Sequence, residues 1–246
     1  MAGRIAKKWG DFSFPGKITF NLRGSGGQSF GAFLVAGMDV TVTGEANDYI
    51  GKGMAGGTLT ILPPPGAAFD PSEASIVGNT CLYGATGGKF FAHGRAGERF
   101  AVRNSMCDAV CEGAGDHCCE YMTGGCVVSL GVVGRNVGAG MTGGLGYFYD
   151  VDGSFCSKVN PEIVSVQKIV SDAGERQLKD LLGEYVERTQ SPTAQKILEG
   201  WETQKENFWQ LVPPSEKETP QASATVIMDS FDETVDAPVS AGVTAA

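Results

Sequence analysis

The densest cluster of chemically capable side chains in this sequence is Asp116-His117-Cys118-Cys119-Glu120. Histidine, cysteine and aspartate all bind zinc, but structural zinc sites need ligand pairs separated by about two to four residues. Cys107 and Cys111 lie four positions apart, and no second pair follows at metal spacing. Adjacent residues on a strand also point to opposite faces. We therefore expect no metal site here, and cysteines that act as small buried hydrophobic residues.

Nucleophilic catalysis by a cysteine would need a nearby histidine, and the two histidines are His93 and His117. The sequence identifies neither a third catalytic group nor oxyanion donors for such a pair. The cysteine count is odd and no secretion signal is present, so we expect reduced thiols rather than disulfides. The seven cysteines are Cys81, Cys107, Cys111, Cys118, Cys119, Cys126 and Cys156. We expect no catalytic residue in this segment.

Two glycine-rich segments could be mistaken for phosphate-binding loops. A dinucleotide loop must open a helix, but Gly51–Gly57 is followed by Thr58–Leu62, which has the composition of a strand. The segment Gly84–Phe90 is one residue shorter than a Walker loop, and Phe90 cannot supply the hydroxyl that binds Mg²⁺. We expect both segments to be turns, and no cofactor-binding residue among them.

Single arginines stand beside turn asparagines at Arg103-Asn104 and Arg135-Asn136, and Arg99 follows Glu98. One interpretation is contact with an anion or with another domain. The alternative, which we favour, is that each arginine bridges neighbouring turns of a stacked structure.

A recurring Gly-Gly pair followed by a short apolar run indicates the secondary structure that carries these side chains. The pairs are Gly26-Gly27, Gly56-Gly57, Gly87-Gly88, Gly124-Gly125 and Gly143-Gly144. Alternation of polar and apolar residues over 17–23 and 38–43 predicts two further strands. Segments 78–84 and 97–104 add a turn and a strand each. A glycine turn that repeatedly precedes a strand is typical of a stacked architecture.

This pattern predicts an all-β fold, a right-handed parallel β-helix (a single-stranded solenoid) with about 15–20 residues per rung. Its corners require positive φ, which glycine adopts freely. We place Asn47, Asn79, Asn104 and Asn136 at the same corners, since asparagine tolerates this conformation. The alternative, a β-sandwich, would have evenly spaced hairpin turns and fewer paired glycines. Residues 63–75 interrupt the pattern and predict a surface loop.

Composition divides the chain into three regions. Residues 1–160 hold 32 of the 36 glycines and carry a net charge of −1, whereas residues 161–246 carry −8. We therefore expect a β-helix domain over 1–160, a helical extension over 161–214, and a disordered acidic tail over 215–246. Neither half is basic, which argues against nucleic acid and anionic membrane as partners. The longest apolar runs are about half the roughly 20 residues that a bilayer span needs.

The helical extension contains two predicted helices. The first begins at Ser171 and has an apolar face at helical spacing, formed by Leu178, Leu181, Leu182, Tyr185 and Val186. The second begins at Ser191-Pro192 and ends at Pro213-Pro214. Its apolar side comprises Ile197, Leu198, Trp201 and Phe208. We expect these helices to cover an end or a flank of the solenoid.

Three stretches together resemble one family. They are Gly44–Gly53, then Gly78–Gly88 with Gly97–Asn104, then Gly115–Gly144. They are similar to the C-terminal GXGXG domain of the glutamate synthase large subunit, over roughly residues 2–214. The Cys118-Cys119 pair, Cys126 and the ending 208–215 resemble the ferredoxin-dependent type of plastids and cyanobacteria.

The resemblance implies a place in a long enzyme that makes two glutamates from glutamine and 2-oxoglutarate. Its upstream domains would be a glutaminase with a catalytic cysteine, a central domain, and a barrel that binds FMN and an iron–sulfur cluster. Ferredoxin would be the electron donor and the chloroplast stroma the compartment. Met1 would then match an internal position, so the absence of a targeting signal in this segment says nothing about location. This segment would be a non-catalytic structural domain that packs against the upstream domains.

A second interpretation belongs to a different class. Similar β-helices also occur as separate subunits of redox enzyme complexes, and one of the subunits of formylmethanofuran dehydrogenase is an example. Bound metal or flavin in the purified chain would favour this alternative.

Overall fold

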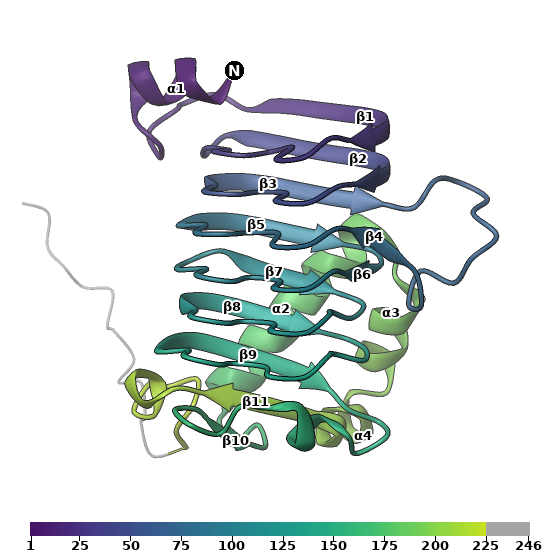
Figure 1. Ribbon diagram of the computed structural model, residues 1–246, viewed down its shortest axis with the longest axis vertical. Coiled ribbons are helices and arrows are strands. Elements are labelled where there is room, and N and C mark those ends of the chain that lie inside the picture. Colours follow the sequence, from purple (N-terminus) through teal and green to yellow (C-terminus); the bar gives the residue numbers. More distant parts are fainter. Residues whose placement is uncertain (225–246) are drawn as a thin grey trace, which may run out of the picture.

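The computed structural model of the chain describes residues 1–224. Seven parallel strands stack into one sheet in chain order, and Figure 1 shows them lying one above another. This confirms the predicted parallel β-solenoid. The strands are β1 (Ile18–Gly26), β2 (Met38–Ala46), β3 (Ala55–Leu62), β5 (Gly87–Ala92), β7 (Asp108–Cys111), β8 (Thr123–Ser129) and β9 (Gly143–Tyr149). We call this stack the strand face.

The rung length agrees with the prediction. Paired positions on neighbouring strands lie 18 to 20 residues apart in five of the six steps. The step from β3 to β5 takes 31 residues, because the predicted loop at 63–75 is inserted there. This loop projects from the solenoid at the right of Figure 1.

A second stack of backbone, which we call the left-handed face, lies between successive strands. It consists of six five-residue segments, at 29–33, 49–53, 80–84, 99–103, 117–121 and 136–140. In every segment the first, third and fifth residues have φ between 54° and 71°. Twelve of these eighteen residues are not glycine, although a side chain in this conformation costs roughly 1–2 kcal/mol.

Hydrogen bonds between neighbouring turns hold the left-handed face together. In the segment 117–121, the N–H groups of His117 and Tyr121 donate to Arg135 O and Ala139 O of the next turn, at 2.9 and 2.8 Å. The N–H of Cys119 donates in the other direction, to Phe100 O, at 2.9 Å. Buried backbone groups are therefore paired on this face as they are in a sheet.

These turns correct part of the strand prediction. The apolar runs at 28–34, 78–84 and 97–104 form left-handed segments and not strands, because their alternate residues adopt positive φ. Strand β7 was missed, since no glycine pair precedes it. The buried Asn104 stands before it instead, and its amide donates to Cys107 O and Gly124 O at 2.8 and 3.3 Å.

The glycine pairs lie at the start of β3, β5, β8 and β9. The two glycines of each pair are required for different reasons. The second glycine has positive φ, as at Gly125 (82°). The first has no room for a side chain, as at Gly124, where a Cβ atom would lie 1.8 Å from Ser105 O. The placement of four asparagines at positive-φ corners was correct for Asn136 and wrong for the other three.

The two ends of the solenoid differ. At the N-terminal end, the short helix α1 (Ala2–Trp9), which the sequence pattern did not predict, lies beside β1 and buries Ile5. At the other end, β11 (Phe208–Val212) pairs antiparallel with β9, and β10 (Ser165–Gln167) pairs with β11. A two-stranded sheet is formed by β4 (Ser75–Val77) and β6 (Arg95–Ala96).

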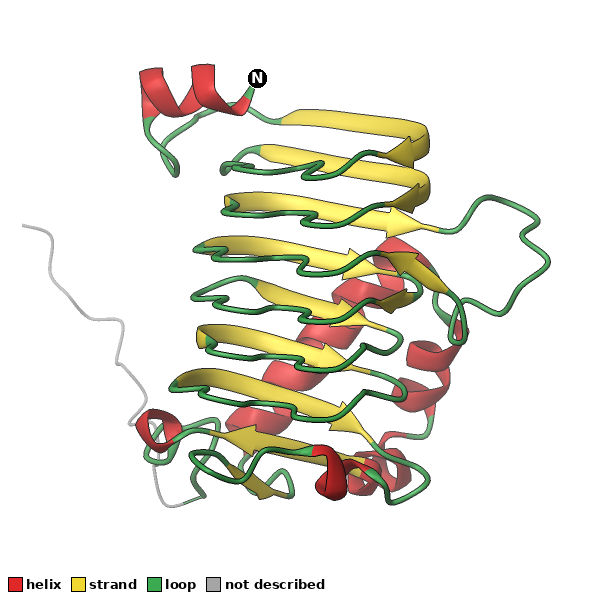
Figure 2. Cartoon of the chain, viewed as in Figure 1, coloured by secondary structure: helices red, strands yellow, loops and turns green. Residues whose placement is uncertain are grey.

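Helix α2 (Asp172–Thr189) lies across the outside of the strand face (Figure 2). It begins as predicted, with the Ser171 hydroxyl accepting a hydrogen bond from Gly174 N. The predicted apolar side is buried at Leu178, Leu181, Leu182 and Tyr185, and it contacts β3, β5 and β7. The helix therefore covers a flank of the solenoid, as expected.

The remainder of the extension differs from the prediction. The second helix is interrupted at Gly200, giving α3 (Pro192–Glu199) and α4 (Trp201–Gln204), and Phe208 lies in β11. Three single-turn helices are η1 (Phe155–Lys158), η2 (Lys205–Asn207) and η3 (Pro214–Glu216). The prediction of a disordered tail from residue 215 onward was wrong for 215–224. Ala222 is buried there, and Gln221 O accepts hydrogen bonds from the side chains of Gln210 and Ser171. The rest of that predicted tail, 225–246, lies outside the described residues.

Two apolar cores lie on opposite sides of the strand face. Successive residues of a strand alternate between them: Phe90 belongs to the core inside the solenoid, and Phe91 to the core beneath α2. Val127 and Val128 repeat this alternation on β8.

Candidate functional site

The residues that first suggested metal chemistry belong to the left-handed face. Both Cys118 and Cys119 are buried, with their sulfur atoms 3.7 Å apart, because Cys119 has positive φ and does not alternate as a strand residue would. Asp116 bonds Arg135, and Glu120 pairs with Arg99. Among residues 1–224, no group of three or more histidine, cysteine, aspartate or glutamate side chains is arranged to hold a metal ion.

The cysteines behave as core residues. Six of the seven are buried, and Cys156 is exposed. Burial raises the pKa of the Cys81 thiol to about 12 and places that of Cys107 well above its usual range. These thiols are therefore protonated near neutral pH, whereas a nucleophilic cysteine must be a thiolate.

Neither histidine pairs with a cysteine in the described part of the chain. His117 Nδ1 lies 2.9 Å from the Asn136 amide nitrogen and 3.8 Å from Glu120 Oε1. His93 follows β5 and is half-buried, and this burial lowers its pKa, against opposing effects from Glu112, Asp70 and the Thr189 backbone. The arrangement that cysteine catalysis would require is not formed by these side chains.

The two glycine-rich segments are structural. Gly51–Gly57 spans a left-handed segment and the first residues of β3, and Gly84–Phe90 likewise leads into β5. Neither opens a helix, so neither presents helix N–H groups to a phosphate. The ammonium group of Lys89 contacts Glu184 of α2.

The arginines bridge neighbouring turns, which is the interpretation that we favoured from the sequence. Arg99 lies 3.5 Å from Glu120, and Arg135 lies 3.0 Å from Asp116. The Arg103 guanidinium lies 6.0 Å from the centre of the Tyr121 ring. Each pair joins one turn of the solenoid to the next.

A buried polar group that the sequence reasoning missed lies where α2 and α3 meet the strand face. Glu112 directly follows β7 and is 1% exposed. Its Oε1 accepts hydrogen bonds from the Tyr185 and Ser191 hydroxyls, at 2.7 and 2.5 Å. Ser191 also caps α3 by accepting from Ala194 N at 3.2 Å. A charged residue directly after an apolar strand was the one signal in the sequence, and its partners lie more than 70 residues away.

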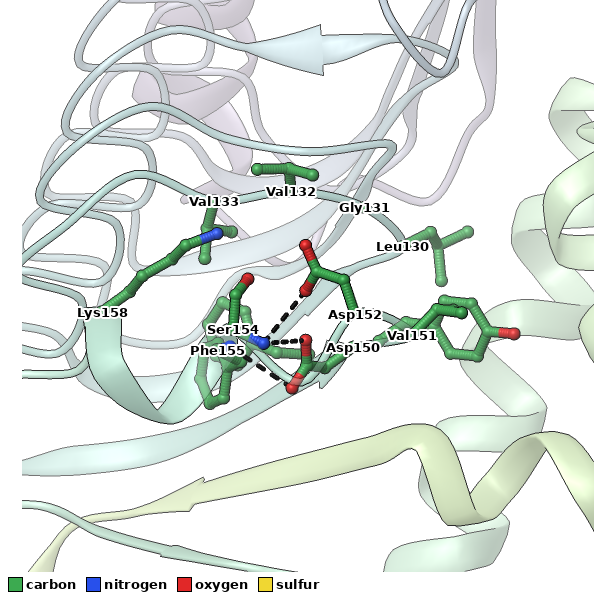
Figure 3. Close-up of a pocket in the computed structure, with 12 residues that line it drawn as sticks. Leu130, Gly131, Val132, Val133, Asp150, Val151, Asp152, Ser154, Phe155 and Lys158 are labelled. Atoms are coloured by element: carbon green, nitrogen blue, oxygen red, sulfur yellow. Dashed lines mark hydrogen bonds between the residues drawn. The ribbon is translucent and has the colours of Figure 1, made fainter.

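A small pocket of about 230 Å³ lies where β9 leads into η1 (Figure 3). Figure 3 shows Asp150 and Asp152 directed at the backbone of Ser154 and Phe155. Both carboxylates accept from Ser154 N at 3.0 Å, and Asp150 also accepts from Phe155 N and from Trp209 Nε1, at 3.3 and 3.2 Å. These oxygens fix a turn, so the pocket offers little unused polar chemistry.

The described residues thus define a class of protein: a parallel β-solenoid with a strand face, a left-handed face and a helical flank. Asp116, Glu120 and the arginines that pair with them join one turn to the next. None of the described helices is both long and apolar enough to cross a membrane.

Comparison with known proteins gives the family. The family model described as the GXGXG motif matches residues 1–214, and the chain belongs to this family. It is 58% identical over 233 residues to ferredoxin-dependent glutamate synthase 1, chloroplastic/mitochondrial, of Arabidopsis thaliana. It is 59% identical over 226 residues to ferredoxin-dependent glutamate synthase 2 of Synechocystis, and 58% over 224 residues to the chloroplastic enzyme of Spinacia oleracea.

These matches cover 95%, 92% and 91% of this chain, but 14% of each relative. The chain therefore spans about one seventh of the length of the curated relatives that it matches, and is homologous to one segment of ferredoxin-dependent glutamate synthases. The resemblance noted in the sequence is confirmed.

Proposed function

We propose that this chain is the non-catalytic solenoid domain of a ferredoxin-dependent glutamate synthase, which makes two glutamates from glutamine and 2-oxoglutarate. The observation that carries the proposal is the identity of 58–59% over more than nine-tenths of the chain to enzymes of that name. The commitment of the polar side chains to contacts between turns supports a structural role.

The physical role follows from the stacking. Hydrogen bonds join the turns on both the strand face and the left-handed face, so the solenoid resists bending and shear. Such a body can hold a glutaminase domain and an FMN-binding domain in register while ammonia passes between them. In this proposal FMN and the iron–sulfur cluster belong to the upstream domains, ferredoxin donates electrons to them, and the enzyme acts in the chloroplast stroma.

The first experiment tests whether this segment carries chemistry. The chain of 246 residues is purified, its visible spectrum is recorded, and bound zinc and iron are measured. We expect no flavin absorbance, no stoichiometric metal, and no glutamate formation from glutamine and 2-oxoglutarate. Stoichiometric metal or flavin would favour a separate redox subunit instead.

The second experiment tests the register-holding role in a complete synthase that contains this segment. Leu59→Ala opens a cavity in the solenoid core, where Leu59 is fully buried, and such changes cost about 2–5 kcal/mol. We expect glutaminase activity to persist while more free ammonia escapes per glutamate formed. A matched substitution of the exposed Leu22 to alanine should leave this ratio unchanged. Equal loss of both activities, without ammonia escape, would contradict the proposal.

A further inference from the structure

An open cavity of about 620 Å³ lies on the helical flank, bounded by the inserted loop at 63–72, the end of β3 and the junction of α2 with α3. We call it the loop cleft. One wall is apolar and is formed by Leu62, Pro64, Pro65, Phe69 and Pro192. The cleft is distinct from the pocket in Figure 3, which lies beside β9.

The ionisable residues that line the loop cleft are Glu112, Asp70 and His93. No lysine or arginine is among the residues that line it. Burial lowers the pKa of His93, against opposing effects from Glu112, Asp70 and the Thr189 backbone, and so disfavours the positively charged imidazolium in the cleft. The carbonyl end of α2, at Thr189 and Gln190, also borders the cleft and carries partial negative charge. The lining therefore favours a cation.

Glu112 supplies the specific feature. Its Oε1 already accepts two hydroxyl hydrogen bonds, whereas its Oε2 is buried and has no hydrogen-bond partner among the described residues. A buried carboxylate oxygen without a partner is costly, and a cation held beside Glu112 in the cleft would offset that cost.

The geometry at Glu112 also selects among cations. A guanidinium binds a carboxylate best through two parallel hydrogen bonds, which require both oxygens to be free. Only Oε2 is free here, and this suits the compact charge of an ammonium group. A metal ion would need several ligands, and the described residues supply no such group.

We propose that the loop cleft binds a primary ammonium group carried on an alkyl chain, with Glu112 Oε2 as its counter-ion and the proline and Phe69 wall against the alkyl chain. A free alkylamine and a lysine side chain from another polypeptide segment share this chemistry. The inference does not depend on the proposed function.

The test measures binding to the 246-residue chain by nuclear magnetic resonance titration, with n-butylammonium, n-butanol and n-propylguanidinium as probes. We expect n-butylammonium to shift the amide resonances of His93, Glu112 and Thr189. The uncharged and guanidinium probes should bind at least about tenfold more weakly, a difference of about 1.4 kcal/mol. Equal binding of n-butanol and n-butylammonium would overturn the proposal.

Glu112→Gln removes the charge and retains an oxygen that can accept from Tyr185 and Ser191, and it should weaken n-butylammonium at least about tenfold. Glu98→Gln, at an exposed position just before the left-handed segment 99–103, is the matched control and should bind normally. If Glu112→Gln does not fold, Phe69→Ala on the exposed loop provides the second variant and should weaken binding about threefold or more. Unchanged affinity in the folded Glu112→Gln or in Phe69→Ala would overturn the proposal.

A second arm separates the two sources of the ammonium group. A blocked Gly-Lys-Gly peptide is titrated beside n-butylammonium, with a blocked Gly-norleucine-Gly peptide as its uncharged match. Tighter binding of the lysine peptide than of the free amine would identify a polypeptide ligand, and the reverse order a small amine. Failure of both to bind more tightly than their uncharged matches would overturn the proposal.

Discussion

The strand face and the left-handed face form the same kind of stack from different backbone conformations. Strand residues alternate between two cores and can carry bulky side chains on both sides, such as Phe90 and Phe91. The left-handed face reverses the sign of φ at every second residue, yet its N–H and C=O groups also bond to the neighbouring turns. Regular hydrogen bonding between turns thus does not require extended strands.

The two faces also differ in what covers them. On the strand face, Phe91, Val110 and Val128 are buried beneath α2. On the left-handed face, Phe33 and Tyr121 are 64% and 53% exposed. The apolar core under α2 therefore stabilises one face, whereas the other depends on hydrogen bonds and on the side chains inside the solenoid. Four experiments test this difference, in decreasing order of the change in stability that we expect.

The first concerns why each face needs glycine. Gly124→Ala, at the start of β8, would place Cβ 1.8 Å from Ser105 O, and we expect a loss of roughly 3 kcal/mol or more in the free energy of unfolding. Gly84→Ala, on the left-handed face, meets nothing within 4 Å and has φ of 62°, so only about 1 kcal/mol of conformational cost is expected. Urea unfolding followed by circular dichroism measures both. Equal losses would show that crowding does not distinguish the faces.

The second concerns the cover. Tyr185 of α2 is fully buried, and its hydroxyl lies 2.7 Å from Glu112 Oε1 and 3.0 Å from Ala92 O. The hydroxyl has one hydrogen to donate, so Tyr185→Phe leaves one of these buried acceptors without it and should cost about 2 kcal/mol. Tyr121→Phe removes a hydroxyl from the exposed face and should change stability by less than about 0.5 kcal/mol. A similar loss in both variants, by the same unfolding assay, would argue against a special contribution from the covered face.

The third concerns backbone strain. Thr80 is β-branched and has φ of 59°. Thr80→Gly relieves the backbone strain of this conformation but increases the entropy of the unfolded chain, and the net result should be a rise of about 1 kcal/mol in the free energy of unfolding. Thr41→Gly, in the middle of β2, should lower it by about 1 kcal/mol. Thermal melting of the two variants gives the sign of each change. A loss at Thr80 would mean that the left-handed conformation is not strained there.

The fourth concerns pH at the helical flank. Burial lowers the pKa of His93 below its usual value near 6.5, despite the opposing influence of Glu112, Asp70 and the Thr189 backbone. As pH falls through about 6.5, His93 of the unfolded chain binds a proton, whereas His93 of the folded chain binds one only at lower pH. The contribution of His93 to the free energy of unfolding is therefore present above about pH 6.5 and is lost below it. We expect a smaller loss of stability between about pH 7.5 and 5.5 in His93→Asn. Urea midpoints measured across this range provide the test, and parallel curves for the two proteins would contradict it.

Much of the architecture could be predicted from particular residues. Gly-Gly pairs located β3, β5, β8 and β9, because the absence of a Cβ atom there is needed whatever the neighbours are. Ser171 and the leucines that follow it located α2, since a cap and a helical period are local signals. Strand β7 was missed because the side chain of Asn104 takes the place of the glycine pair, with hydrogen bonds to Cys107 O and to Gly124 O of the next turn.

The candidate site was much less predictable. The cluster at 116–120 attracted attention by composition, but Asp116 and Glu120 pair with arginines 19 and 21 positions away in neighbouring turns. Glu112 attracted none, because a single charged residue acquires its chemistry from Tyr185 and Ser191, which α2 and α3 bring from 73 and 79 residues away.

Glycine spacing and apolar periodicity act over a few residues, so the amino-acid sequence alone was enough to predict the solenoid, its rung length and its helical flank. The left-handed backbone of Phe33, Thr80 and Arg103 runs against the preference of these residues and became visible only in the folded structure. The physical reason is that hydrogen bonds between turns outweigh the local cost of that conformation, and these bonds exist only when the turns are stacked.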